Sequence, residues 1–250
     1  MSVKALIVKA PGTNCDQEAK WGLELAGAKP EIRYLKELQE RPQILFDYGL
    51  LFVPGGFSYG DYLGSGKLFA LFLESALGQN LRRFAEKGRP VLGVCNGFQV
   101  LTKMGLLPWG ETPCVSLTYN ASNRFECRWV GLELENNSVF AKKLPADKRR
   151  LLAQFELPIA HGEGRFVAAT PETLDRLGRE GHVFLRYSKE NPNGSENAIA
   201  GITNREGNVI GLMPHPERFV ISDQHYDSSG SQAGKPWGLE FLKAAVRLSN

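Results

Sequence analysis

The first half of the chain alternates short apolar segments with segments of helical periodicity, and this alternation constrains the fold more than any other feature. The expected strands span Val3–Ala10, Glu31–Leu35, Tyr48–Val53 and Pro90–Val94. The expected helices follow them, from Asn14 or Asp16 to Ala26, from Lys67 to Lys87 and from Asn96 to about Lys103. Strands with an apolar residue at nearly every position are typical of a parallel sheet covered by helices on both faces. The sequence therefore predicts an α/β fold.

The second half is richer in strand signals. Strands are expected near Cys114–Tyr119, Phe125–Glu133, Leu151–Ile159, Val183–Tyr187, Ala198–Thr203 and Val209–Met213, and helices at Pro171–Gly181 and Trp237–Leu248. The polar run Ser222–Lys235 is expected to be a flexible loop. No repeat or linker divides the chain, so residues 1–250 are predicted to form one domain.

Composition and charge exclude several classes of protein. Hydrophobic residues make up 42% of the chain, enough for a full core, and the net charge of +3 is too small to indicate binding to nucleic acid or a membrane surface. The densest basic stretch, Lys142–Arg150, is interpreted as a solvated surface turn rather than a phosphate-binding patch. No apolar run reaches the ~18 residues of a membrane span, and the four cysteines form no C-x-x-C pair. We therefore expect a cytoplasmic protein with reduced cysteines.

The strongest local motif is Gly93-Val94-Cys95-Asn96-Gly97, which lies between an expected buried strand and an expected helix. This is the G-x-nucleophile-x-G elbow with cysteine in place of serine, and its glycines leave room for a sharp turn that presents the side chain. The helix N-terminus favours a thiolate there, and the N–H of Asn96 is placed to bind an oxyanion. The alternative is that Cys95 is a small buried hydrophobic residue, the usual state of a free cysteine.

A cysteine nucleophile needs a base, and the base needs a group that orients it. Among the four histidines, His215 lies directly after an expected strand, and a proline on each side fixes its backbone. Glu217 is two residues further on and points to the same side of an extended chain. Its carboxylate can therefore hold one imidazole nitrogen while the other faces Cys95. The alternative is a rigid surface loop with an incidental His and Glu.

The turn Pro54-Gly55-Gly56 follows the third expected strand, beside the elbow in a parallel sheet. Its glycines allow backbone N–H groups to approach a ligand, so Gly56 is a second candidate for an oxyanion site, with an ordinary tight turn as the alternative. The nearby Gly60–Lys67 only partly resembles a phosphate-binding P-loop, because Asp61 and Leu68 replace its required Gly and Ser or Thr. We predict no nucleotide site and no metal site in this chain.

These motifs and their order resemble the class I, triad-type glutamine amidotransferases, with PGG at 54–56, GVCNGFQ at 93–99 and PHPE at 214–217. Longer strings are similar to the glutaminase subunits of phosphoribosylformylglycinamidine synthases: PGTNCD at 11–16, VPGGFSYGDYLGSGK at 53–67, NASNRFECRWV at 120–130 and AHGEGRF at 160–166. The resemblance covers residues 3–219 and resumes in the expected C-terminal helix. It implies a flavodoxin-like fold with a central, mostly parallel sheet, helices on both faces and extra antiparallel strands.

The resemblance also implies a role for each motif. Cys95 attacks the side-chain amide of glutamine, releasing ammonia and leaving a γ-glutamyl thioester that water hydrolyses to glutamate. His215 moves protons, Glu217 orients it, and the amides of Gly56 and Asn96 form the oxyanion hole. The residues implied to hold glutamine are Gln99 and the backbone near Arg124 and Phe125. A face toward a partner protein is implied for His161, Glu163 and Arg165, with ordinary surface solvation as an equal alternative.

In this family the ammonia passes to a separate synthetase subunit, which binds ATP, Mg²⁺ and formylglycinamide ribonucleotide in purine biosynthesis. No cofactor is therefore expected in this chain, and the presence of a small third subunit is left open. Two other functions also stay open. One is a class I glutaminase serving another synthetase, or a γ-glutamyl hydrolase on the same fold; the other is a non-catalytic binding protein.

Overall fold

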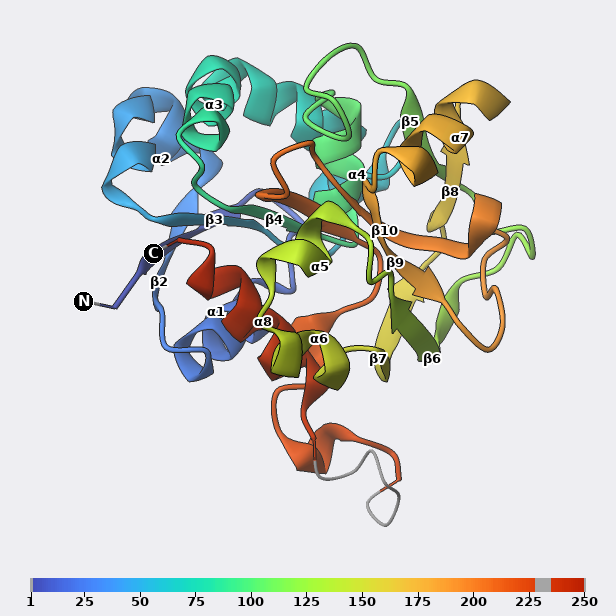
Figure 1. Ribbon diagram of the computed structural model, residues 1–250. Helices are drawn as coiled ribbons and strands as arrows, with labels where there is room; N and C mark the ends of the chain where they lie inside the picture. Colours follow the sequence, from blue (N-terminus) through green and yellow to red (C-terminus); the bar gives the residue numbers. More distant parts are fainter. Residues whose placement is uncertain (1, 228–234, 250) are drawn as a thin grey trace.

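One nine-stranded sheet forms the centre of the structure, a computed structural model that describes residues 2–227 and 235–249 (Figure 1). The strand order is β2-β1-β3-β4-β11-β10-β9-β6-β7. These strands are β1 (Lys4–Lys9), β2 (Lys29–Tyr34), β3 (Leu50–Val53), β4 (Val91–Val94), β6 (Glu126–Leu134), β7 (Gln154–His161), β9 (Val183–Tyr187), β10 (Ile199–Thr203) and β11 (Val209–Leu212). Two further strands, β5 (Val115–Thr118) and β8 (Arg165–Ala168), pair in a separate small sheet.

The large sheet changes from parallel to antiparallel in its middle. Strands β2, β1, β3, β4 and β11 pair in parallel, whereas every neighbouring pair from β11 to β7 is antiparallel. Strands β3, β4 and β11 are buried along their whole length, as expected where helices cover both faces. The predicted α/β fold, with antiparallel strands added to a parallel sheet, is confirmed.

Helices cover both faces of the sheet. Within the described residues the α-helices are α1 (Asp16–Leu25), α2 (Leu35–Glu40), α3 (Lys67–Glu86), α4 (Asn96–Lys103), α5 (Val139–Lys143), α6 (Ala146–Leu151), α7 (Pro171–Arg179) and α8 (Trp237–Arg247). Helices α3 and α4 lie on one side, and α1 and α8 pack together on the other (Figure 1). None of the helices so described is long and apolar enough to cross a membrane.

Short helices are the main difference from the sequence prediction. Helices α2, α5 and α6 were not predicted. Helices α5 and α6 occupy the basic stretch Lys142–Arg150, so the turn expected there is wrong, whereas its basic side chains are exposed or half-buried, as expected of a solvated surface. Lys148 Nζ donates to Glu240 Oε2 at 2.6 Å, which ties α6 to α8. Helices this short are marginal on their own and depend on such tertiary contacts. The local sequence therefore carries little signal for them.

The polar segment that begins at Ser222, which was predicted to be a flexible loop, makes a packing contact with the body of the protein. Residues Ser222–Gln224 form a 3-10 turn, and the imidazole of His225 packs on the rings of Trp129 and Phe219, with centroids 4.7 and 5.3 Å away. As far as Asp227, the predicted loop is therefore anchored by this one buried side chain, and its flexibility stays a prediction. The rest of that prediction, residues 228–234, lies outside the described residues.

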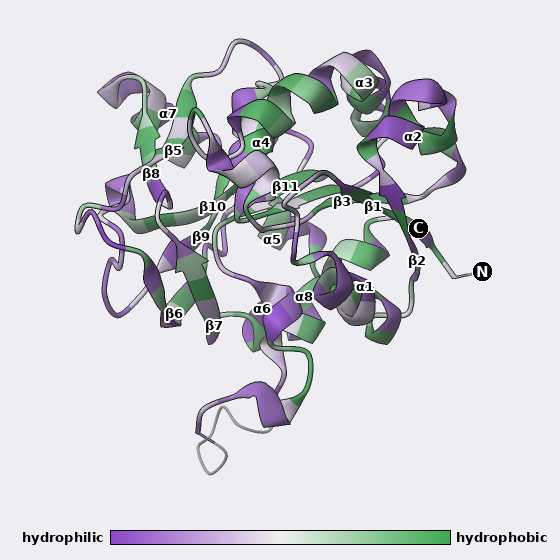
Figure 2. Ribbon diagram, turned by 180° about the vertical axis from the view of Figure 1, so that it is seen from behind, coloured by the Kyte–Doolittle hydropathy of each residue, from purple (hydrophilic) through white to green (hydrophobic). Residues whose placement is uncertain are grey.

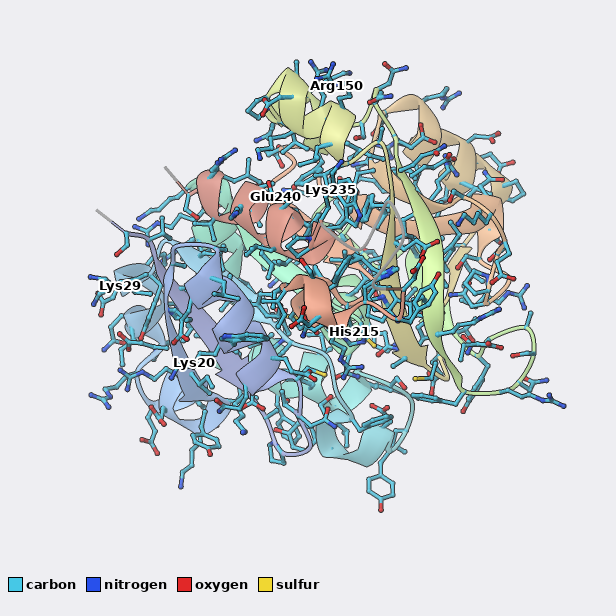
Figure 3. The ribbon with its side chains drawn as sticks, turned by 90° about the horizontal axis from the view of Figure 1, so that it is seen from below. Lys20, Lys29, Arg150, His215, Lys235 and Glu240 are labelled. Atoms are coloured by element: carbon cyan, nitrogen blue, oxygen red, sulfur yellow. The ribbon has the colours of Figure 1, made fainter. Side chains whose placement is uncertain are left out.

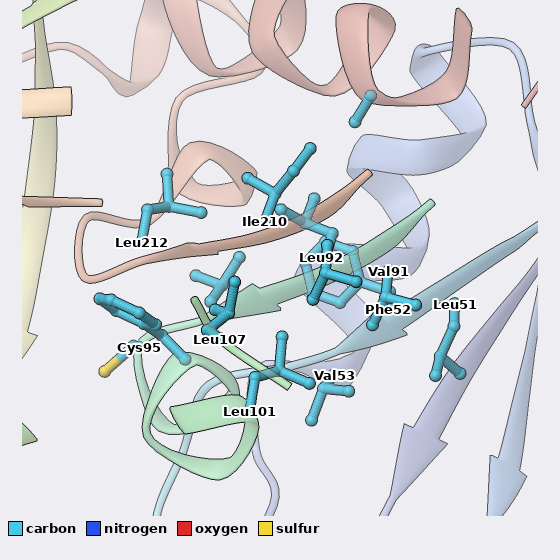
Figure 4. Close-up of a cluster of buried hydrophobic side chains, with 14 of the residues drawn as sticks. Leu51, Phe52, Val53, Val91, Leu92, Cys95, Leu101, Leu107, Ile210 and Leu212 are labelled. Carbon is cyan, nitrogen blue, oxygen red and sulfur yellow. The ribbon is translucent and has the colours of Figure 1, made fainter. Parts of the chain in front are cut away.

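The core lies between the parallel strands and the helices. Figure 2 shows apolar residues along β3 and β11 and polar residues concentrated on α2 and α6. In the close-up of Figure 4, Leu101 and Leu107 lie on the α4 side of the sheet, Ile210 lies on the opposite face, and Cys95 lies at the edge of this cluster. One end of the functional site is therefore built directly on the core.

The packing of α8 generates the first prediction. Phe241 is 1% exposed, with ring centroids of Phe140 and Phe184 at 5.6 and 6.1 Å. Phe241→Ala leaves a cavity and should lower the free energy of unfolding by roughly 3–5 kcal/mol, measured by guanidinium denaturation. Phe72, which is 44% exposed, provides the matched control Phe72→Ala with a much smaller loss. Equal losses for the two variants would contradict this packing.

Candidate active site

The elbow around Cys95 is shaped by the close approach of α4 to the sheet. A Cβ added at Gly97 would lie 1.9 Å from the carbonyl oxygen of Val53, so no larger residue fits there. Cys95 itself has φ of +51°, a conformation that non-glycine residues rarely adopt. Its N–H donates to the carbonyl of Leu212 at 2.8 Å, which fixes the turn to β11. The thiol is therefore held at the carboxyl ends of the parallel strands, as the elbow motif predicts.

His215 and Glu217 follow the neighbouring strand β11. The N–H of His215 donates to the carbonyl of Pro158 in β7 at 2.9 Å. The turn Pro216–Arg218 packs against α1 and β7, and Figure 3 shows His215 in the region between these two elements. Nδ1 of His215 and Oε1 of Glu217 are 2.7 Å apart, and both side chains are buried. The extended backbone at residue 215 thus places the carboxylate on the imidazole, as the spacing predicted.

Gly55 lies where the thiol and the imidazole meet. A Cβ added to Gly55 would lie 2.8 Å from Cε1 of His215 and 3.3 Å from Cβ of Cys95. The structure therefore brings the elbow, the histidine and Glu217 together, although they are far apart in the sequence. Nδ1 of His215 is hydrogen-bonded to Glu217, and the other imidazole nitrogen, Nε2, has no hydrogen-bond partner among the described residues.

The charge state of His215 is set by its neighbours. Burial alone would lower the pKa of His215, but the negative charge of Glu217, followed by that of a Cys95 thiolate, leaves this pKa raised well above its usual value. The protonated form of the imidazole is therefore favoured. A positive charge beside the sulfur stabilises negative charge on it, so the group can activate a thiol nucleophile and donate a proton.

A second thiol, that of Cys15, lies in the site and was not predicted from the sequence. Sγ of Cys15 would lie 3.4 Å from a Cβ on Gly55, and Nη2 of Arg218 donates to this sulfur at 3.1 Å. Burial raises the pKa of the Cys15 thiol. Its position just after the first strand was the available signal, because the carboxyl ends of parallel strands share one edge.

Among the described residues, one cluster of three side chains is of the types that can bind a metal ion. The ligand atoms of Cys15, His215 and Glu217 lie within 4.8 Å of one another. The carboxylate of Glu217, however, is bonded to Nδ1 of the imidazole, while Nε2 points to the opposite edge of the ring. The arrangement therefore fits a carboxylate that orients a histidine better than a shared set of ligands.

The first turn of α4 is braced by a chain of side-chain hydrogen bonds. Ser58 Oγ donates to Asn96 Oδ1 at 2.5 Å, and Asn96 Nδ2 donates to Gln99 Oε1 at 3.0 Å. Gln99 Nε2 donates to the carbonyl of Glu163 at 2.6 Å. Asn96 is the first residue of α4, so its N–H has no partner within the helix and can bind an anion. Gln99 is engaged inside the protein, and its contact with a substrate stays a prediction.

The remaining predicted binding residues lie around the turn at Gly56. A Cβ on Gly56 would lie 2.6 Å from Asn14 Oδ1, and its φ of +130° also requires glycine. The next residue, Phe57, stacks on Phe125 with a centroid distance of 6.1 Å. The carbonyl of Arg124 accepts a hydrogen bond from Asn120. The predicted oxyanion turn and the segment Arg124–Phe125 are thus adjacent, while their roles stay predictions.

The three residues predicted to face a partner have different positions. His161 is 3% exposed and lies at the end of β7, so it lies beneath the surface, and its position near a partner-facing surface stays a prediction. Glu163 and Arg165 are half-buried: the Glu163 carboxylate accepts from the N–H of Ser65, and Arg165 Nε donates to the carbonyl of Gly194. The histidine of the motif at residues 160–166 is buried because β7 ends at this residue, beside the core.

Comparisons with known proteins agree with this geometry. A family model described as a CobB/CobQ-like glutamine amidotransferase domain matches residues 2–246. The chain is 40% identical to phosphoribosylformylglycinamidine synthase subunit PurQ of Treponema denticola, covering 98% of each chain. It is 44% identical to the subunit of the same name from Thermus thermophilus, covering 96% of this chain and 98% of that one. It also resembles a chain in the structure of PurLQS from Thermotoga maritima, with a TM-score of 0.74, 35% identity and 99% of each chain covered.

The electrostatics of the pair His215–Glu217 lead to a prediction. Glu217→Gln removes the charge that raises the pKa of His215, so the imidazole should lose its proton at a lower pH. The titration midpoint of His215, followed by ¹⁵N-histidine NMR, is expected to fall toward the ordinary value of about 6.5 or below it. The exposed Glu172→Gln on α7 is the control and should leave the midpoint unchanged. An unchanged midpoint in Glu217→Gln would refute the assigned cause.

Proposed function

Because the chain belongs to the family of CobB/CobQ-like glutamine amidotransferase domains, we propose that it is the glutaminase subunit of a phosphoribosylformylglycinamidine synthase. It hydrolyses L-glutamine to glutamate and ammonia and passes the ammonia to a synthetase subunit. That subunit converts formylglycinamide ribonucleotide to formylglycinamidine ribonucleotide with ATP, in de novo purine (IMP) biosynthesis. The observation that carries this proposal is the buried site at Gly55, where Cys95 and the His215–Glu217 pair meet, in a chain similar to the named subunits.

The reaction begins with attack of the Cys95 thiolate on the side-chain amide carbon of glutamine. The carbonyl oxygen becomes an oxyanion, which the N–H groups of Gly56 and Asn96 stabilise. His215 gives its proton to the amide nitrogen, so the C–N bond breaks and NH₃ leaves. A γ-glutamyl thioester remains on Cys95.

Water completes the cycle. His215, now neutral, takes a proton from a water molecule as the water attacks the thioester carbon. The C–S bond breaks, glutamate leaves, and the thiolate–imidazolium pair is restored. Throughout, Glu217 fixes the tautomer and orientation of the imidazole through the 2.7 Å hydrogen bond at Nδ1.

We assign no cofactor to this chain and place ATP and Mg²⁺ on the synthetase. In support, the segment that partly resembles a P-loop already binds an internal anion: the N–H of Ser65 donates to both carboxylate oxygens of Glu163, at 3.3 and 3.2 Å. A small third subunit is compatible with this division of labour. A cytoplasmic location is part of the proposal, and four cysteines that are all free support it.

The nucleophile gives the most direct genetic test. Cys95→Ala in the complex with the synthetase should lower glutamine-dependent synthesis by more than about 1000-fold, while synthesis from free ammonium is retained because that chemistry lies on the synthetase. Cys127→Ala, at an exposed cysteine, is the control and should keep both activities. Loss of both activities in Cys95→Ala would mean that the mutation damages assembly.

The choice of synthetase separates the proposed function from its alternatives. Ammonia release from glutamine should rise when the purified synthetase of formylglycinamide ribonucleotide is added to the chain. No rise with this synthetase would favour a glutaminase serving another synthetase, and release from γ-glutamyl peptides instead of glutamine would favour a hydrolase.

A further inference from the structure

His161 is a buried histidine beside the catalytic thiol that the mechanism above does not use. It is the last residue of β7 and is 3% exposed. The carbonyl oxygen of its neighbour Ala160 lies 3.7 Å from Sγ of Cys95, and Pro158 in the same strand binds the backbone of His215. The end of β7 thus runs along the reacting groups.

The hydrogen bonds of Asn120 fix the tautomer of His161. Nδ2 of Asn120 donates to the carbonyls of Arg124 and His161, both at 2.8 Å, so its Oδ1 must point the other way. Oδ1 accepts from the N–H of Gly164 at 3.0 Å and lies 3.1 Å from Nδ1 of His161. Because a carboxamide oxygen only accepts, Nδ1 of His161 carries the hydrogen.

The other ring nitrogen is therefore a lone-pair acceptor. Burial, with a further contribution from the nearby His215, lowers the pKa of His161 to about 4, so the ring is neutral at physiological pH. Nε2 is inaccessible to solvent and has no partner among the described residues. A buried acceptor without a donor costs free energy, so this position calls for a ligand that supplies an N–H group.

The ring is also held rigidly. A Cβ built on Gly164 would lie within 2.2 to 2.5 Å of three atoms of the His161 ring, so the imidazole lies directly against the Gly164 backbone. Together with the Asn120 contact, this packing keeps Nε2 at one place, in the residue next to the one whose carbonyl approaches Cys95. Such a fixed acceptor suits the recognition of a group at a defined point of the reaction.

Within the proposed function, glutamine brings two N–H donors into the site: its α-ammonium group and the amide nitrogen that receives the proton of His215. We propose that Nε2 of His161 accepts a hydrogen bond from the side-chain amide nitrogen of glutamine as it leaves the carbon atom as ammonia. The nitrogen departs with two hydrogens of the amide and one from His215, and His161 takes none of them. Because burial and His215 oppose a charge on His161, this ring has no proton at Nε2 to give to the departing ammonia.

The test uses the full complex with the synthetase and the variant His161→Asn. Its shorter amide places an N–H where Nδ1 was, which keeps the bond to Asn120 and removes the acceptor at Nε2. The kcat of glutamine-dependent synthesis should fall roughly 10- to 100-fold, with little change in KM for glutamine and none in ammonium-dependent synthesis. His182→Asn is the control, since His182 is buried beside Glu180, away from the triad, and should change neither parameter.

A second variant keeps the proposal testable if Asn is poorly tolerated. His161→Gln places an amide group at the position of Nε2 and abandons the bond to Asn120, so it should retain a higher kcat than His161→Asn. A higher kcat for Asn than for Gln would show that His161 serves only the Asn120 contact and would overturn the proposal. A rise in KM alone would also overturn it, because it would assign the contact to the α-ammonium group in ground-state binding.

These outcomes are independent of the test of function. Glutamine-dependent synthesis that survives Cys95→Ala would remove the proposed function itself. An unchanged kcat in His161→Asn, with Cys95→Ala inactive, would remove only the role of His161.

Discussion

The site depends on how closely helix α4 lies on the parallel sheet. A side chain at Gly97 would meet the carbonyl of Val53 at 1.9 Å, and one at Gly211 would meet the ring of Phe98 at 2.1 Å. With no side chain at these two positions, the helix begins directly above the strand ends, and the chain at Cys95 must turn through a conformation with positive φ. This turn presents the thiol at the edge where β11 delivers His215. The packing of α4 on the core therefore also fixes the geometry of the catalytic site.

Two buried histidines in this site differ in charge because of one carboxylate. Burial lowers the pKa of both rings, and for His161 that effect prevails. For His215 the bonded Glu217 reverses it, so one ring is a proton donor and the other a neutral acceptor. The same strand, β7, positions both: it ends at His161 and binds the backbone of His215 through Pro158. One strand therefore positions both the imidazole bonded to Glu217 and the acceptor proposed for the leaving nitrogen.

Sequence patterns predicted the parts of this structure that depend on local chemistry. The apolar strands gave the parallel sheet, the glycines around Cys95 gave the elbow, and the spacing of His215 and Glu217 gave their hydrogen bond. Parts that depend on distant contacts were missed. The tautomer of His161 is set by Asn120, 41 residues away, and α6 is held by a lysine that reaches α8. No local pattern encodes such contacts, because the partner lies on another element that only the completed fold brings close.

Two thiols, Cys95 and Cys15, flank the same imidazole, and only Cys95 lies in the elbow. The decisive measurement is peptide mapping of the complex after reaction with a diazo-ketone analogue of glutamine, which alkylates the attacking sulfur. The elbow geometry predicts modification of Cys95 and none of Cys15, whose sulfur is held by Arg218. Modification of Cys15, or of neither thiol with the synthetase present, would contradict the assignment of Cys95 as the nucleophile.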